Sequence, residues 1–119
     1  MTCQILCDDP QECKEQSLSC PAGLACRVEC LAQQSCEKAV LECGEATDCS
    51  ANCTGDQSCK EMRLSCGPTA CGVSCTGENS CEHTKAVCGT GRCYATCSEE
   101  VEKRPALENC AVAQSCEPC

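Results

Sequence analysis

The chain has 119 residues, with 21 cysteines, one tyrosine, no tryptophan and no phenylalanine, and its formal net charge is -9. So few aromatic side chains exclude a conventional apolar core, and a small chain without one needs covalent or metal cross-links. The negative charge argues against nucleic-acid binding, which needs lysine and arginine. No apolar run is long enough to insert into a membrane as a helix.

The cysteines fall into four classes that recur in fixed order at intervals of 22 or 23 residues. The first class is Cys3, Cys26, Cys49, Cys71 and Cys93. The second, four residues later, is Cys7, Cys30, Cys53, Cys75 and Cys97. The third, six residues further on, is Cys13, Cys36, Cys59 and Cys81. The fourth, after seven more, is Cys20, Cys43, Cys66 and Cys88. This regularity predicts one structural unit repeated along the chain.

Each repeat begins with a predicted strand, residues 3–7 in the first repeat, with the pattern Cys-x-aliphatic-x-Cys. This period of two places both cysteines and the aliphatic residue on one face. The aliphatic positions are Ile5, Val28, Ala51, Val73 and Ala95. A second short strand leads into each fourth-class cysteine, with Leu18, Leu41, Leu64 and Ala86 facing inward. Glycines such as Gly44 and Gly55 mark the two turns.

Two strands and two turns per repeat predict an all-β fold, a disulfide-rich parallel β-solenoid of about five coils, expected to be right-handed. Residues outside the cysteine classes also indicate stacking. The dipeptide after the third class alternates in charge, as Lys14-Glu15, Glu37-Lys38, Lys60-Glu61 and Glu82-His83. Stacked opposite charges attract one another. A further column, which predicts a ladder of amide hydrogen bonds, holds Gln11, Gln34, Gln57 and Asn79.

The spacing predicts two sets of disulfides. First- and second-class cysteines lie about 13 Å apart along an extended strand, too far for a bridge. The second and third classes face each other across a turn, which predicts Cys7–Cys13, Cys30–Cys36, Cys53–Cys59 and Cys75–Cys81. The fourth class then bonds the first class of its own coil or of the next coil. We favour the next coil, which gives Cys20–Cys26, Cys43–Cys49, Cys66–Cys71 and Cys88–Cys93.

The C-terminal segment departs from the repeat. Residues 1–97 hold the regular coils, and we expect residues 98–119 to form a cap with a helix starting near Pro105. Its helical face would contain Leu107, Cys110, Ala111 and Gln114. The alternative is a long loop and an imperfect sixth coil, because Cys110 to Cys116 has the usual six-residue step. The odd number of cysteines leaves at least one unpaired, and we expect it in the tail, among Cys97, Cys110, Cys116 and Cys119.

The run CTGDQSCKEMRLSCGPTACGVSCTGENSCEHTKAVCG, residues 53–89, resembles the tandem cysteine-rich repeats of bacterial exported proteins and lipoproteins, myxobacterial ones especially. The resemblance covers residues 3–97 and rests on the spacing Cys-x3-Cys-x5-Cys-x6-Cys. It implies an extracytoplasmic location and brings no established activity. More loosely, the expected architecture is similar to the disulfide-filled β-helix of insect antifreeze proteins, which have shorter coils and paired threonine columns.

No residue is predicted to be catalytic, to bind a cofactor or to hold a metal. His83, the only histidine, lies in a charged column, and we expect it on the surface. Cys116-Glu-Pro-Cys119 has the spacing of thiol-redox motifs, but it lacks their βαβ context and is expected to be structural. Residues 1–20 lack the features of a signal peptide, so an export signal would have been removed.

We therefore expect a non-enzymatic structural or binding module, secreted, periplasmic or on the cell surface. Its partner would be an unidentified protein or surface, and the unpaired cysteine would be available for a disulfide-linked dimer. One alternative is thiolate metal binding as in metallothioneins, although the chain lacks their Cys-x-Cys pairs. A second is binding to ice or mineral. This needs a flat regular array, and the outward strand positions, such as Arg27, Ser50 and Tyr94, are irregular.

Overall fold

The computed structural model describes residues 2–10, 12–98 and 104–119. Within these ranges the chain forms eleven strands and a single three-residue 3-10 helix, with no α-helix. Among the described residues, nothing helical reaches the length and apolarity that a bilayer crossing demands. The strands form two parallel sheets, which confirms the predicted all-β class.

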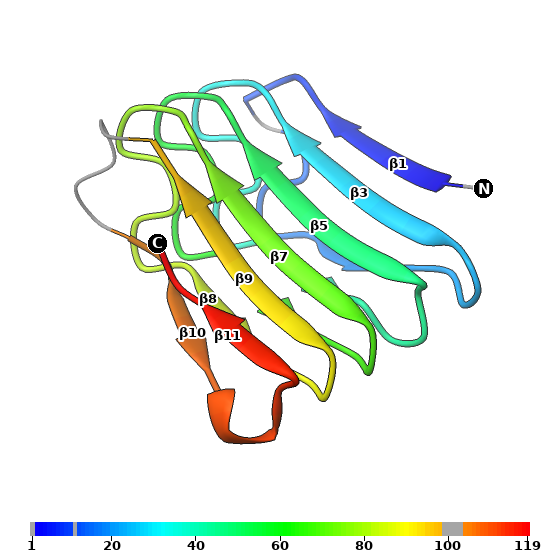
Figure 1. The fold of residues 1–119 in the computed structure, drawn as a ribbon. Coiled ribbons are helices and arrows are strands. Elements are labelled where there is room, and N and C mark those ends of the chain that lie inside the picture. The colour runs from blue at the N-terminus through cyan, green and yellow to red at the C-terminus, as the bar shows by residue number, and fades with distance from the viewer. Residues whose placement is uncertain (1, 11, 99–103) are drawn as a thin grey trace.

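Six strands make the larger sheet, here called the long sheet, in the order β1-β3-β5-β7-β9-β11 (Figure 1). They are β1 (Thr2–Cys7), β3 (Ala25–Cys30), β5 (Asp48–Cys53), β7 (Ala70–Cys75), β9 (Arg92–Cys97) and β11 (Ser115–Glu117). Every neighbouring pair in this sheet is parallel. The chain therefore returns to the same end of the sheet before each new strand.

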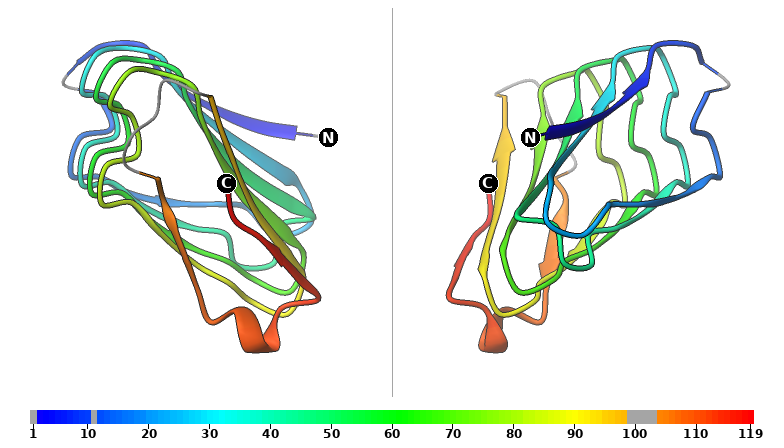
Figure 2. Two further views of the ribbon diagram at one scale, coloured as in Figure 1. Left: turned by 60° about the vertical axis from the view of Figure 1, so that its left-hand side comes forward. Right: turned by 90° about the vertical axis from the view of Figure 1, so that its right-hand side faces the viewer.

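Five strands make the second sheet, here called the short sheet, in the order β10-β8-β6-β4-β2. They are β2 (Ser17–Ser19), β4 (Val40–Glu42), β6 (Arg63–Ser65), β8 (Lys85–Val87) and β10 (Ala106–Glu108). Each coil contributes one strand to each sheet, and successive coils follow the same outline when viewed near the stacking axis (Figure 2, left). This arrangement is the predicted β-solenoid of about five coils.

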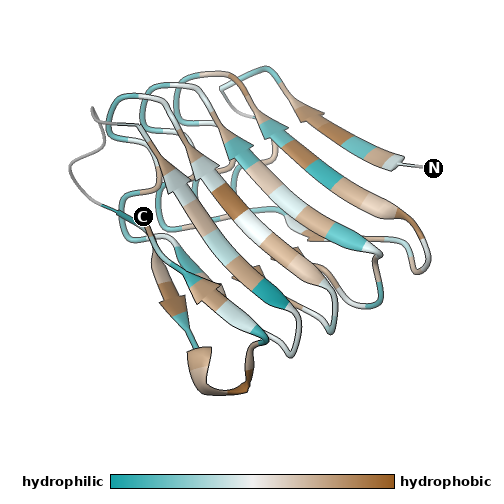
Figure 3. Cartoon of the chain, viewed as in Figure 1, coloured by the Kyte–Doolittle hydropathy of each residue, from teal (hydrophilic) through white to brown (hydrophobic). Residues whose placement is uncertain are grey.

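Equivalent residues of successive coils pair in register, so the core consists of rows. One row runs through Ile5, Val28, Ala51, Val73 and Ala95. The opposite row runs through Leu18, Leu41, Leu64, Ala86 and Leu107. Hydropathy alternates along the long strands, as the period of two requires (Figure 3). Both predicted rows are confirmed, and cysteines fill most of the remaining interior.

A tight loop joins each long strand to the next short strand, and its backbone is unusual. In the second coil, Gln34, Cys36 and Lys38 have φ of 61°, 60° and 59°. A left-handed conformation costs a non-glycine residue roughly 1–2 kcal/mol. Hydrogen bonds between coils offset this cost, since the Gln34 N–H donates to Asp56 O at 2.9 Å and the Lys38 N–H to Lys60 O at 2.8 Å.

The C-terminal segment does not form the expected helical cap. Instead β10 and β11 extend both sheets, joined by the 3-10 helix η1 (Cys110–Val112). Two three-residue strands satisfy backbone groups that would otherwise face an open sheet edge. For example, the Cys88 N–H donates to Glu108 O at 2.8 Å. Residues 104–119 thus continue the solenoid, since β10 completes the fifth coil and β11 begins an imperfect sixth. Residues 99–103 of the expected cap lie outside the described residues.

Candidate functional site

The described residues enclose no pocket. Two features remain that could carry chemistry or recognition. One is the cysteines, which form two columns of disulfides, one after the long strands and one after the short strands. The other is the outer face of the long sheet, which is formed by the alternate residues of its strands that point away from the core.

The first disulfide column joins the end of each long strand to the loop that follows. Its bridges are Cys7–Cys13, Cys30–Cys36, Cys53–Cys59 and Cys75–Cys81. Their Cα–Cα distances are 5.9–6.0 Å, within the usual range for a disulfide. The structure therefore brings together the same pairs that the second- and third-class spacing predicts. The left-handed conformation of each third-class cysteine is part of this turn.

The second disulfide column joins each short strand to the next long strand. Its regular bridges are Cys20–Cys26, Cys43–Cys49, Cys66–Cys71 and Cys88–Cys93, the next-coil pairs. Cys110–Cys116 extends this column, because Cys116 pairs in register with Cys93. The six-residue step from Cys110 to Cys116 therefore corresponds to a fourth-to-first-class bridge rather than a second-to-third-class bridge.

The position of the unpaired cysteine differs from the prediction. All four tail cysteines are bonded, as Cys97–Cys119 and Cys110–Cys116. Cys116 and Cys119 are thus not bonded to each other, despite their spacing. The unbonded residue is Cys3, which is half-buried in β1. In the later coils, a cysteine of this class bonds a fourth-class cysteine of the preceding coil.

Neighbouring bridges of the second column touch one another. The Cys20 and Cys49 Sγ atoms lie 3.7 Å apart, and those of Cys43 and Cys71 lie 3.8 Å apart, although neither pair is bonded. In four groups, three sulfurs lie within 4.8 Å of one another: Cys7/Cys13/Cys36, Cys30/Cys36/Cys59, Cys43/Cys49/Cys71 and Cys88/Cys110/Cys116. These groups could hold a metal only after reduction, because the thiolate is the ligand.

The only aromatic residue lies on the outer face of the long sheet rather than in the core. The Tyr94 ring covers Gly72, where an added Cβ would lie 2.2 Å from Tyr94 Cε2. The Arg92 guanidinium lies 4.9 Å from the ring centroid, and its Nε donates to Glu117 Oε2 at 2.8 Å. Burial raises the pKa of Tyr94, and Asp48 adds to that effect. The two nearby arginines oppose it.

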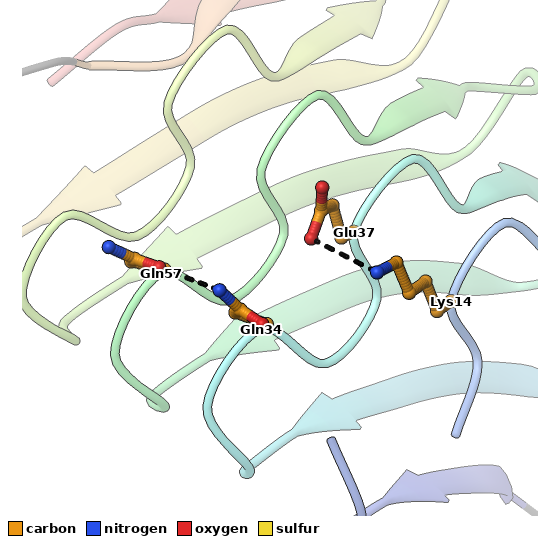
Figure 4. A network of polar contacts seen from close by, with 4 residues as sticks. All are labelled: Lys14, Gln34, Glu37 and Gln57. Carbon is orange, nitrogen blue, oxygen red and sulfur yellow. Dashed lines mark hydrogen bonds and ion pairs between the residues drawn. The ribbon is translucent and has the colours of Figure 1, made fainter. Parts of the chain in front are cut away.

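Side chains between coils include one of the expected charge pairs and one of the expected amide contacts. Lys14 Nζ lies 3.8 Å from Glu37 Oε2, and Gln34 Nε2 donates to Gln57 Oε1 at 3.1 Å (Figure 4). Gln11 lies outside the described residues. His83 is 66% exposed and lies 3.5 Å from Glu82, so it is a surface residue as predicted.

A row of buried serines was not anticipated from the sequence. Ser35, Ser58 and Ser80 are fully buried, one in each of three coils. The Ser35 hydroxyl donates to Ala32 O and the Ser58 hydroxyl to Gly55 O, each at 2.7 Å. Ser35 and Ser58 thus each bond a carbonyl three residues earlier, whereas the buried Ser80 hydroxyl has no hydrogen-bond partner among the described residues. The recurring tripeptide Gln/Asn-Ser-Cys is the signal that could have predicted this row.

The two disulfide columns and the polar outer face of the long sheet are therefore the candidate functional features of this chain. Neither contains a general base beside a nucleophile or a formed cation site in the described residues. Comparison with known proteins finds no protein-family model, no curated protein and no solved structure that matches the chain.

Proposed function

We propose that this protein is a non-enzymatic, extracytoplasmic scaffold, a rigid module that presents a polar surface to a protein or surface partner. The density of cross-links carries the proposal. Between Cys7 and Cys93, no run longer than six residues lacks a bridged cysteine; residues 14–19 are one such run. Each bridge restricts the unfolded chain, so local opening is limited to a few residues.

The bonding state of the cysteines supports the extracytoplasmic location. Ten disulfides are present, and such bridges persist in oxidising compartments and are rare in a reducing cytosol. The resemblance to exported bacterial repeats supports the same compartment. The strongly acidic composition favours solubility and does not favour nucleic acid or anionic lipid as the partner.

Limited proteolysis tests the scaffold proposal. The oxidised protein should resist trypsin at exposed basic residues such as Arg27 and Arg92, which are held in strands. The same protein should be degraded rapidly after reduction and alkylation. The variant Cys53→Ala/Cys59→Ala should be cleaved at an intermediate rate. Rapid cleavage of the fully oxidised protein between residues 12 and 97 would overturn the proposal.

Metal sequestration is a second candidate, favoured by the four sulfur groups within 4.8 Å. It requires most cysteines to be thiolates in the natively isolated protein. A thiol count under denaturing, non-reducing conditions separates the two functions. One thiol per chain, from Cys3, supports the scaffold. Many thiols together with bound zinc or cadmium would support metal binding instead.

Ice or mineral binding receives no support from the outer face. Arg27 lies 4.0 Å from Glu29 there, and Asn52 donates to Glu29 at 3.0 Å, so neighbouring coils present different groups. An ice-shaping assay checks this alternative, and we expect unfaceted crystals.

A further inference from the structure

We propose that Cys110 forms a mixed disulfide with small thiols, and that the second disulfide column carries the exchange to Cys26 near the other end of the solenoid. This inference concerns the sulfur chemistry of the column and does not depend on the scaffold function. It rests on two observations, the exposure of one terminal bridge and the contacts between successive bridges.

The Cys110–Cys116 bridge is the accessible end of the column. Among the described residues, Cys110 is the only exposed cysteine, and it lies in η1 at the open end of both sheets. The bridges Cys43–Cys49 and Cys88–Cys93 are closed to solvent, since Cys43 and Cys88 are each only 1% exposed, whereas Cys20 and Cys66 are half-buried. A small thiolate such as that of glutathione therefore has readier access to Cys110 than to any other cysteine of this column.

Within the column, the fourth-class sulfurs of Cys20, Cys43 and Cys88 each lie near a sulfur of a neighbouring bridge. Cys88 Sγ is within 4.8 Å of both Cys110 Sγ and Cys116 Sγ. Towards the N-terminus, the corresponding non-bonded contacts are Cys43–Cys71 at 3.8 Å and Cys20–Cys49 at 3.7 Å. Cys66 is bonded to Cys71, which pairs in register with Cys93, and the exchange passes from Cys93 to Cys66 at this equivalent position. Sulfurs held this close react as an intramolecular pair with a high effective concentration.

The first steps balance without an added oxidant or reductant. The incoming thiolate attacks Cys110 Sγ, a mixed disulfide forms, and the Cys110–Cys116 bond breaks to release Cys116 as a thiolate. Cys116 then attacks Cys88 Sγ, which forms Cys88–Cys116, breaks Cys88–Cys93 and releases Cys93. Each step exchanges one sulfur–sulfur bond for another, so the number of bonds stays constant.

The later steps repeat this pattern through the coils. The bonds formed are, in order, Cys66–Cys93, Cys43–Cys71 and Cys20–Cys49. The last step breaks Cys20–Cys26, and Cys26 takes up the proton that the incoming thiol lost. Cys26 pairs in register with the unbonded Cys3, so two thiols then lie on adjacent strands of the N-terminal coils.

The test uses the full oxidised chain with reduced glutathione, near the ordinary thiol pKa of about 8.5. After incubation, thiols are alkylated in acid-quenched samples, and the bridges are mapped by mass spectrometry without reduction. The proposal predicts one glutathione on Cys110 and alkylation of Cys26 in addition to Cys3. Alkylation of Cys116 with the other four bridges of the column unchanged would overturn it, and so would the absence of glutathione on Cys110.

A matched variant distinguishes transfer along the column from direct reduction of Cys20–Cys26. In Cys43→Ala/Cys49→Ala one bridge is missing, so the exchange should stop two steps earlier and leave the thiol on Cys71. Alkylation of Cys26 at the wild-type level in this variant would contradict transfer. If the variant does not fold, the disulfide map of the wild-type protein after incubation with glutathione still tests the proposal. Protease resistance of the untreated protein reports on the scaffold proposal separately.

Discussion

The Sγ atoms of Cys20 and Cys49 lie 3.7 Å apart, although the two residues belong to different disulfides and are separated by 29 positions in the sequence. This contact shows how the interior is filled. Stacked bridges occupy the corners of each coil, and rows of small aliphatic residues occupy the space between them. The disulfides act on the unfolded chain and also supply packing contacts in the folded one.

Loss of one interior bridge should lower stability without changing the fold. We expect Cys53→Ala/Cys59→Ala to reduce the free energy of unfolding by about 2–3 kcal/mol, because a short loop in the unfolded chain is released. Guanidinium denaturation under non-reducing conditions measures the change. An unaltered midpoint would mean that this bridge adds nothing to the stability supplied by its neighbours.

The leucine row of the short sheet should contribute to the stability of the fold, although it contains few side chains. Leu64 is 1% exposed between Leu41 and Ala86, and Leu64→Ala should cost about 2–5 kcal/mol from lost burial and an unfilled cavity. Leu31 is 44% exposed, so Leu31→Ala is the matched control, with an expected change within about 0.5 kcal/mol. Equal effects of the two substitutions on the unfolding midpoint would contradict the placement of the core.

Glycine at position 55 is required by the approach of the preceding coil. A Cβ there would lie 2.2 Å from Ala32 O, so Gly55→Ala should force the coils apart and cost about 1–3 kcal/mol. Thr54 is exposed beside it, and Thr54→Ala should leave the thermal midpoint nearly unchanged. A neutral Gly55→Ala would show that the two coils are further apart at this turn.

Tyr94 provides a spectroscopic probe, because it is the only aromatic residue. Burial and Asp48 raise its pKa, so the phenolate absorbance should appear at higher pH in the folded protein than after unfolding. The unfolded chain then loses its proton first, so this residue's stabilising contribution should decrease as the pH rises above about 10. Gly72→Ala, which displaces the ring, should shift the pKa back towards its ordinary value. Identical titrations of folded and unfolded protein would contradict this placement.

The cysteine classes made most of the fold predictable. A period of two within each long strand fixes which residues face inward, and a constant interval fixes the register between coils, so rows such as Val28 and Ala51 follow directly. The sequence leaves both own-coil and next-coil bridges open, with a preference for the next coil. In the structure, the turn after each short strand brings the two cysteines of such a bridge, for example Cys43 and Cys49, to a Cα–Cα distance of 5.8 Å.

Other features depend on contacts that the local sequence does not encode. The sequence of residues 104–119 is typical of a helix with one apolar face. The open edges of both sheets favour strands instead, and Leu107 pairs with Ala86. The unpaired cysteine is Cys3 because the tail folds back and places Cys119 beside Cys97. The left-handed loop residues escaped prediction because glutamine, cysteine and lysine do not favour positive φ, and hydrogen bonds between coils impose it.

Disulfide mapping of the natively isolated protein tests the central claim, that stacked sulfur–sulfur bonds replace a conventional apolar core. Mass spectrometry of unreduced peptides should find ten bridges, among them Cys30–Cys36 and Cys43–Cys49, and one thiol on Cys3. A spectrum with mostly reduced cysteines, or with own-coil bridges such as Cys26–Cys43, would contradict it.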